Sequence, residues 1–172
     1  SDMKALADRY AAGDFSGLQA AAESLLALFP DEGMLWKVLG IALLSQGQDA
    51  LSALQRAAAL LPSDAEVHNS LGNAQEEAGQ PRAAETSYRH AMDLQPSYLP
   101  ALYNLSCLQQ ARGDEVAAEA GYRKVLAQAP DFSAALFNLA VLLEHSGRAD
   151  EAIASYRRVL AIVPQHADAH FN

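Results

Sequence analysis

Residues 133–166, SAALFNLAVLLEHSGRADEAIASYRRVLAIVPQH, decide the fold, because two amphipathic helical patterns in them are separated by one glycine, Gly147. The apolar residues before this glycine follow the i, i+3, i+4, i+7 spacing of one helix face: Leu136, Leu139, Ala140 and Leu143. A second apolar face follows it: Ala152, Ile153, Tyr156, Val159 and Leu160. Pro164 then ends the second pattern. The stretch therefore predicts a helix–turn–helix unit.

The same unit recurs along the chain. The glycines that separate its two halves are spaced by 34, 32, 34 and 34 residues: Gly13, Gly47, Gly79, Gly113 and Gly147. The prolines that end it are spaced by 32, 34, 34 and 34 residues: Pro30, Pro62, Pro96, Pro130 and Pro164. The spacing of 32 marks one short repeat, which lacks two residues. Because Asp49-Ala50 aligns with Glu151-Ala152, these two residues are missing from the turn after Gly47. Repetition at this period is the signature of a solenoid.

The composition also favours an all-α protein. Of the 172 residues, 36 are alanine and 25 are leucine, both strong helix formers. We expect a single domain over 1–172 with first helices near 2–12, 33–46, 65–78, 99–112 and 133–146. Their partner helices are expected near 15–28, 48–60, 81–94, 115–128 and 149–162. The glycines between them are expected to adopt positive φ, which a residue with a Cβ resists.

These patterns resemble the tetratricopeptide repeat (TPR) family. Trp36-x-x-Leu39-Gly40-x-x-Leu43 is similar to the first half of the TPR pattern. The second half is similar to three Ala-x-x-x-Tyr segments: Ala84–Tyr88, Ala118–Tyr122 and Ala152–Tyr156. The resemblance implies a right-handed TPR solenoid of about five repeats. Their expected limits are about 1–32, 33–64, 65–98, 99–132 and 133–166.

The end of the chain matches the start of a repeat. Residues 167–172 align with 133–138, so we expect a partial sixth repeat and a fragment of a longer chain. The second helix of the fifth repeat would then lack part of its cover, with Ile153, Val159 and Leu160 facing the gap. Open apolar ends of solenoids can stack, so head-to-tail self-association through this end is one expected interaction.

Charge and cysteine content exclude several classes of function. Lys+Arg 12 against Asp+Glu 21 gives a net charge of −9, which argues against nucleic acid and against an anionic membrane surface. A single cysteine, Cys107, excludes an internal disulfide and a cysteine-rich zinc site. No segment is apolar and long enough for a signal peptide or a membrane span, so we expect a cytoplasmic protein.

We expect no enzyme activity, cofactor or metal in these residues. His166 and His170 have the i, i+4 spacing of a metal pair, but no third ligand is evident. Cys107 lies within an expected helix with no histidine near it in sequence, so it is interpreted as a packing residue. We therefore predict a binding function.

The TPR resemblance implies that partners bind in a concave groove lined by the first helices. The predicted partner-binding residues are Asn69, Asn73, Glu76, Tyr103, Asn104, Gln110, Phe137, Asn138, Val141, Phe171 and Asn172. Asn104, Asn138 and Asn172 form a row of amides, which both donate and accept hydrogen bonds and so suit an extended peptide backbone. Tyr103 and Phe137 beside the row could pack alternate peptide side chains. The alternative is that these residues only pack between helices.

The amide row also resembles the asparagine ladder in the TPR domain of O-linked N-acetylglucosamine transferases. This similarity implies a substrate-recruiting arm of a bacterial glycosyltransferase of that kind, whose catalytic domain would lie elsewhere. Val38 and Ser70 interrupt the row in the earlier repeats. A self-assembling TPR scaffold is the third interpretation.

The charge of the inward positions favours a neutral or basic partner. TPR domains that bind chaperones hold a C-terminal carboxylate with Lys, Arg and Asn, and only Lys37, Asn73 and Asn104 approach that pattern. Glu76, Glu77 and Glu144 would instead accept a basic or neutral segment. The predicted partner is thus a protein or extended peptide that is not acidic.

We predict that Leu139→Ala lowers the free energy of unfolding by about 2–5 kcal/mol, because it deletes a buried contact between helices and leaves a cavity. Denaturation followed by far-UV circular dichroism measures the change, and the same spectrum tests the all-helical expectation. A loss below about 0.5 kcal/mol, typical of surface positions, would show that the predicted apolar register is wrong.

Overall fold

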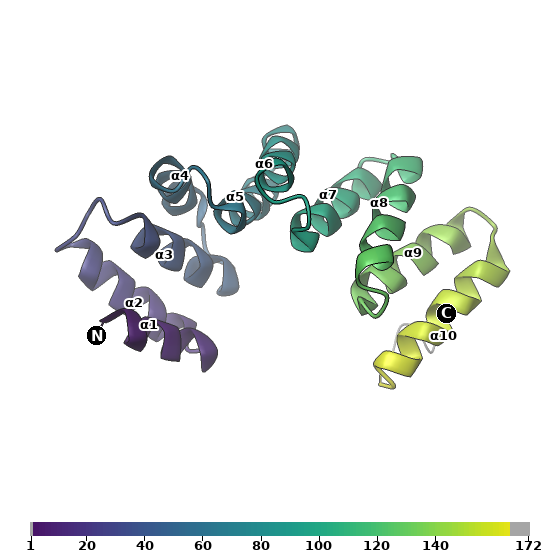
Figure 1. Ribbon diagram of the computed structural model, residues 1–172, viewed down its shortest axis with the longest axis horizontal. Coiled ribbons are helices and arrows are strands. Elements are labelled where there is room, and N and C mark those ends of the chain that lie inside the picture. Colours follow the sequence, from purple (N-terminus) through teal and green to yellow (C-terminus); the bar gives the residue numbers. More distant parts are fainter. Residues whose placement is uncertain (1, 166–172) are drawn as a thin grey trace. The chain divides into compact units, whose positions relative to one another are not determined.

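The computed structural model describes residues 2–165, which form an all-helical solenoid without strands in that range. The helices alternate with short turns (Figure 1): α1 (Asp2–Ala11), α2 (Phe15–Leu26), α3 (Gly33–Ser45), α4 (Leu51–Leu60), α5 (Ala65–Glu77), α6 (Pro81–Leu94), α7 (Leu99–Ala111), α8 (Glu115–Gln128), α9 (Ser133–His145) and α10 (Ala149–Ile162). Each predicted repeat contains one helix pair, so the predicted all-α fold is confirmed. Of the described helices, none is both long and apolar enough for a bilayer span.

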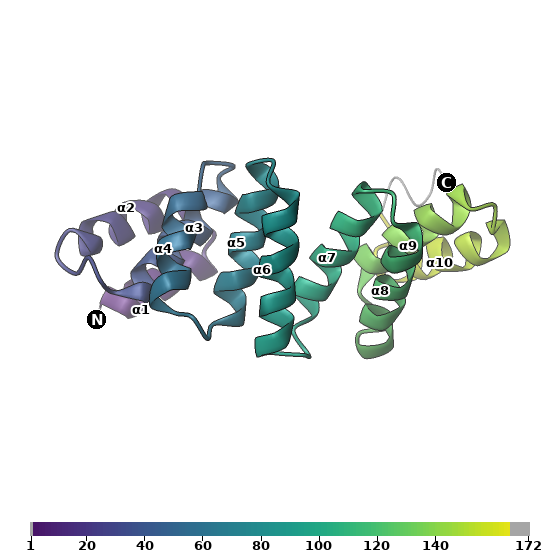
Figure 2. The same ribbon diagram turned by 90° about the horizontal axis from the view of Figure 1, so that it is seen from above.

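The chain divides into two compact units between Tyr98 and Leu99. Unit 1 contains α1–α6, and unit 2 contains α7–α10. Consecutive helices pack against each other within each unit, and α3 also contacts α5 in unit 1. Figure 2 shows the α5–α6 pair of unit 1 side by side. The prediction that the chain acts as one domain stays a prediction.

Glycine ends the first helix of every pair in the described range. The five glycines in these turns have φ between 65° and 79°. At Gly147 the backbone N–H donates to the carbonyl of Glu144 at 3.0 Å, and the next N–H, of Arg148, donates to that of Leu143 at 2.9 Å. These two bonds satisfy carbonyls at the end of the helix. A Cβ at any of the five glycines would meet no atom within 4 Å, so glycine is required by the backbone and not by space.

Within a pair, a large residue of the second helix packs on a small residue of the first. Tyr88 on α6 is fully buried, and a Cβ added to Gly72 on α5 would lie 2.4 Å from its ring. In the α7–α8 pair the first helix carries Ser106, and glycine stands opposite it at Gly121. A Cβ there would lie 2.0 Å from the Ser106 Oγ. Because the interior is close-packed, a larger residue on one helix requires a smaller one on its partner.

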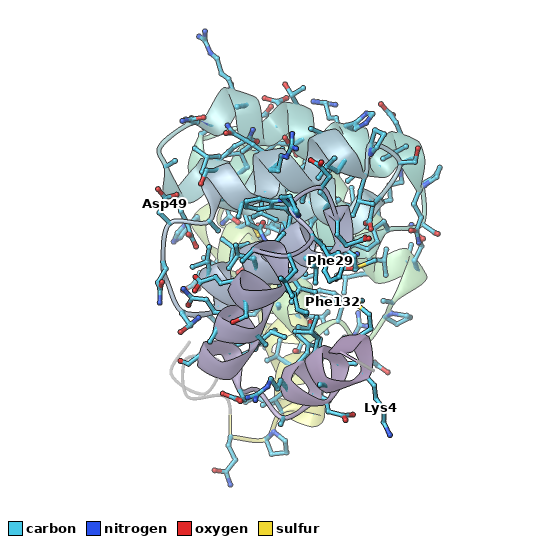
Figure 3. All side chains as sticks on the ribbon, turned by 90° about the vertical axis from the view of Figure 1, so that its left-hand side faces the viewer. Lys4, Phe29, Asp49 and Phe132 are labelled. Atoms are coloured by element: carbon cyan, nitrogen blue, oxygen red, sulfur yellow. The ribbon has the colours of Figure 1, made fainter. Side chains whose placement is uncertain are left out.

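The short repeat differs from its prediction at the start of α4. This helix begins at Leu51 and not near residue 48. Asp49, labelled in Figure 3, lies in the turn, and its Oδ1 accepts the Leu51 N–H at 3.0 Å, which keeps the preceding residues out of the helix. Ala50 is nevertheless buried like Ala152, so the two missing residues lie in the turn as predicted. The other notable difference is α2, which ends at Leu26.

The prediction for the last helix is correct in part. Ile153 on α10 is 43% exposed, as expected for an uncovered position, and Leu160 is half-buried. The prediction for Val159 is wrong, because this side chain is fully buried. It stands at the repeat position of Val125, which is also fully buried. The expected sixth repeat, 167–172, lies outside the described residues.

Gly147→Val should lower the free energy of unfolding by about 1–2 kcal/mol or more, because a β-branched residue resists positive φ. Gly147→Asn is the matched variant, and its loss should be smaller because asparagine tolerates this conformation. Denaturant unfolding of both variants measures the difference. Equal losses would contradict the assignment of a backbone requirement to this turn.

Candidate functional site

The described residues that were predicted to bind a partner lie on first helices in both units. Three of them, on α5, define the unit 1 face: Asn69, Asn73 and Glu76. Six, on α7 and α9, define the unit 2 face: Tyr103, Asn104, Gln110, Phe137, Asn138 and Val141. Phe171 and Asn172 lie outside the described residues, so the third amide of the predicted row has no described position.

A tyrosine of the second helix holds the polar side chains of the unit 1 face. The Tyr88 hydroxyl lies 2.8 Å from Oδ1 of Asn73 and also contacts the carboxylate of Glu76. The ring is buried between α5 and α6, so its hydroxyl requires a partner, and the inward side chains provide it. Asn73 and Glu76 are therefore brought together as a pair, whereas Asn69 is only 7% exposed.

The same contact recurs in unit 2. The Tyr122 hydroxyl donates to Oε1 of Gln110 at 2.6 Å, and the Tyr156 hydroxyl donates to Oε2 of Glu144 at 2.9 Å. In each case the tyrosine follows its partner by 12 residues. The predictions from sequence missed these bonds, although this spacing of tyrosine and polar residue in three repeats is a signal that the sequence contains.

The amide of Asn138 links the two first helices of unit 2. Its Nδ2 donates to the Tyr103 hydroxyl at 3.0 Å and lies 3.4 Å from the Cys107 sulfur. The Tyr122 hydroxyl lies 3.5 Å from the same sulfur. Burial, with a smaller effect of Cys107, raises the pKa of Tyr103 to about 12. Burial likewise raises the pKa of Tyr122, so both phenols keep their protons at neutral pH.

The aromatic residues of the unit 2 face also pack on neighbouring rings. The Tyr103 ring lies 5.1 Å from that of Phe132, and the Phe137 ring lies 5.8 Å from that of Tyr156, measured between centroids. Part of the aromatic surface that was predicted to contact a bound peptide thus packs on other rings of unit 2 instead. Val141 and Asn104 are half-buried.

Unit 1 has an apolar pocket that sequence reasoning did not identify. Its volume is about 260 Å³, and its apolar lining comes mainly from α1 and α3: Met3, Leu6, Tyr10, Met34, Val38 and Ile41. Lys37 and Glu66 also line it. Val38 was interpreted above only as an interruption of the amide row. The signal that was missed is that α3 carries apolar residues, such as Val38 and Ile41, at repeat positions where the next repeat carries polar residues.

Lys37 at this pocket is neutralised by two carboxylates. Its Nζ lies 2.8 Å from Oδ2 of Asp64 and 2.6 Å from Oε2 of Glu66, and the side chain is 12% exposed. Burial by itself lowers the pKa of Lys37, but the bonds to Asp64 and Glu66 outweigh it, so the pKa is raised. Burial tends to raise the pKa of Asp64, yet the bonds from Lys37 and from the Val67 N–H lower it. This lysine is thus occupied and is poorly suited to an anionic ligand.

Two histidines meet on the α5–α6 pair. The rings of His68 and His90 pack edge to face with centroids 4.3 Å apart, and His68 Nε2 lies 2.9 Å from the Pro62 carbonyl oxygen. Burial lowers the pKa of His68, and the nearby His90 lowers it further, against the opposing effects of the Pro62 carbonyl and Asp64. Over residues 2–165, no group of three or more His, Cys, Asp or Glu side chains could hold a metal ion. The predicted pair His166 and His170 lies outside that range.

Comparison with protein families connects this architecture to a known one. The family model of the tetratricopeptide repeat matches residues 45–99 and 103–167. A comparison with curated protein sequences gives no match.

Several solved structures have similar folds. MamA shares 25% identity over 97% of this chain and 92% of its own, with a TM-score of 0.76. A thermophilic TPR protein of Thermus thermophilus shares 22% identity over 99% of this chain and 94% of its own, with a TM-score of 0.78. YrrB, described as a TPR protein with an unusual peptide-binding site, shares 16% identity over 96% of this chain and 87% of its own, with a TM-score of 0.74. The last two similarities concern the fold alone.

The histidine pair predicts a loss of stability in mild acid. Because the pKa of His68 is lower in the folded chain than its unfolded value of about 6.5, the folded state binds fewer protons. Stability should therefore be intact above about pH 6.5 and fall as the pH drops through the folded pKa. Thermal unfolding at a series of pH values measures this loss.

His90→Gln removes the neighbouring imidazole and should make the acid-induced loss smaller. His145→Gln, at an exposed histidine of α9, is the control and should leave the pH dependence unchanged. An identical pH dependence in the wild type and in His90→Gln would contradict this account of the pair.

Proposed function

Because the chain belongs to the tetratricopeptide repeat family, we propose that it is a protein-interaction module that binds an extended segment of a partner protein on its first helices. The unit 1 and unit 2 faces are the proposed contact surfaces. The function assigned is binding and not catalysis, since the polar side chains of these faces are paired with one another and with buried tyrosines.

One observation on the unit 2 face carries the proposal. Gln110 contacts the Tyr122 hydroxyl, which lies 3.5 Å from the Cys107 sulfur, and Asn138 contacts that same sulfur. The two amides make these contacts through opposite ends. The contact of Gln110 uses its oxygen, which leaves the amide N–H groups as donors. The contacts of Asn138 use its nitrogen, which leaves Oδ1 as an acceptor. A fixed donor and a fixed acceptor suit the alternating C=O and N–H groups of an extended peptide, and prior fixation lowers the entropy cost of binding.

Charge selects the kind of segment. The chain has a net charge of −9, and Glu76 and Glu144 are held on inward positions by tyrosine hydroxyls. A neutral or basic segment is favoured and an acidic one is repelled.

The other interpretations stay predictions. The row expected for a glycosyltransferase arm would require Asn172, whose position is not described. Self-association through the C-terminal end would appear as a mass that rises with protein concentration in sedimentation experiments.

The proposal predicts that Gln110→Ala combined with Asn138→Ala weakens peptide binding about 5- to 150-fold, because two hydrogen bonds of about 0.5–1.5 kcal/mol each are lost. The ligand is a segment selected with the wild-type chain from a displayed library of random dodecapeptides. Isothermal titration with the synthetic segment measures the affinity.

Tyr103→Phe is the matched control, because it removes the Tyr103–Asn138 bond but keeps both amides. It should lower affinity less than the double variant does, because Asn138 loses one fixing contact but keeps its amide and its contact with the Cys107 sulfur. If Tyr103→Phe and the double variant lowered affinity equally, the amides would serve packing alone. If the library yielded no segment that binds the wild type, the proposed function itself would be overturned.

A further inference from the structure

We propose that the apolar pocket between α1 and α3 binds one large apolar side chain of the partner segment, with a lysine or arginine next to it in the segment contacting Glu66. This inference rests on the proposed function and names the chemistry of the partner. The pocket belongs to unit 1, whereas the amides that carry the proposed function belong to the unit 2 face.

The size and lining of the pocket suit a single apolar side chain. An apolar cavity of about 150 Å³ is large enough for a benzene ring, so the pocket has room for leucine, methionine or phenylalanine. Leu6 forms part of the buried core, and Val38 and Ile41 line the pocket from successive turns of α3. Met3 and Met34 add flexible side chains that adapt to different shapes.

The edge of the pocket carries apolar surface that a ligand would remove from water. Met3 is 48% exposed and Tyr10 is 53% exposed. Tyrosine at such an edge offers a large contact area and a polar hydroxyl, and it is among the residue types that contribute most to binding energy at interfaces. Covering these side chains would therefore contribute the hydrophobic part of the affinity.

The charges at the pocket determine what stands beside the apolar side chain. Asp64 and Glu66 together outweigh the single charge of Lys37, which leaves one net negative charge. Lys37 is 12% exposed, whereas Glu66 is 46% exposed. The accessible charge is thus a carboxylate, which a basic residue of the partner complements and an acidic residue does not. This charge complementarity commits the occupant to an apolar residue followed or preceded by Lys or Arg.

The test uses heptapeptides of the form Gly-Ser-X-Z-Ser-Gly-Ser, in which X is Leu, Phe or Ala and Z is Lys, Ser or Glu. Binding to the full chain is followed by NMR titration. Peptides with Leu or Phe should bind about 10- to 100-fold more tightly than those with Ala, as expected for burial of one large apolar side chain. Affinity should fall in the order Lys, Ser, Glu at Z, with steps of about 2- to 5-fold.

Two pairs of variants assign the effects to the pocket. Ala7→Phe fills the pocket from an exposed position of α1 and should abolish the preference for Leu or Phe, whereas Ala5→Phe, exposed on the same helix but outside the lining, should preserve it. Glu66→Gln should remove the preference for Lys, whereas Glu23→Gln, at an exposed carboxylate of unit 1 outside the lining, should not.

Several results would contradict the inference. Equal binding of all peptides, or an unchanged preference in Ala7→Phe, would overturn the inference and leave binding at the unit 2 face intact. A preference for Glu at Z would also overturn it. So would a fall in sedimentation mass caused by Ala7→Phe, because a second copy of the chain would then occupy the pocket. Failure of the random library overturns the proposed function separately.

Discussion

A buried tyrosine with a hydroxyl that must be hydrogen-bonded connects the packing of this protein to its surface chemistry. In α6, α8 and α10 the ring lies inside the helix pair and the hydroxyl reaches the first helix. The ring requires a small residue opposite it, and the hydroxyl requires a polar residue. The first helices therefore carry polar inward positions partly because the core demands them. In a fold built this way, a polar residue on the inner side is not by itself evidence of a ligand.

The two units use this constraint differently. In unit 2 every repeat carries a tyrosine, and these tyrosines hold Gln110 and Glu144, while Asn138 joins α9 to Tyr103 of α7. In the first two repeats of unit 1 the tyrosine is absent: Leu54 takes the buried position of the ring and has no hydroxyl to satisfy. The inward positions of α3 are consequently free to be apolar, and Val38 and Ile41 line a pocket there. The loss of one hydroxyl thus permits a change from a hydrogen-bonding surface to a hydrophobic one.

Local chemistry made most of the fold predictable. The glycine turns and helix pairs follow from residues close together in sequence, and their limits agree to within a few residues. The start of α4 was missed because the Asp49 side chain competes with the helix for the Leu51 N–H. Val159 was misplaced because periodicity identifies an apolar face without saying which neighbour covers it. The site was less predictable, since several of its contacts join residues 27 to 35 positions apart, such as Lys37 with Asp64 and Asn138 with Tyr103.

The capping glycines have a practical consequence for the chain as a scaffold. A side chain added at any of the five glycines would meet no atom within 4 Å, so the glycines themselves are not packed against other elements of the described residues. The two residues missing after Gly47 illustrate this, because Ala50 and Leu54 still reach buried positions. Changes in loop length cost little closure entropy. The turns are accordingly the places where a foreign epitope or a reporter domain could be grafted while the helix pairs on either side keep their register.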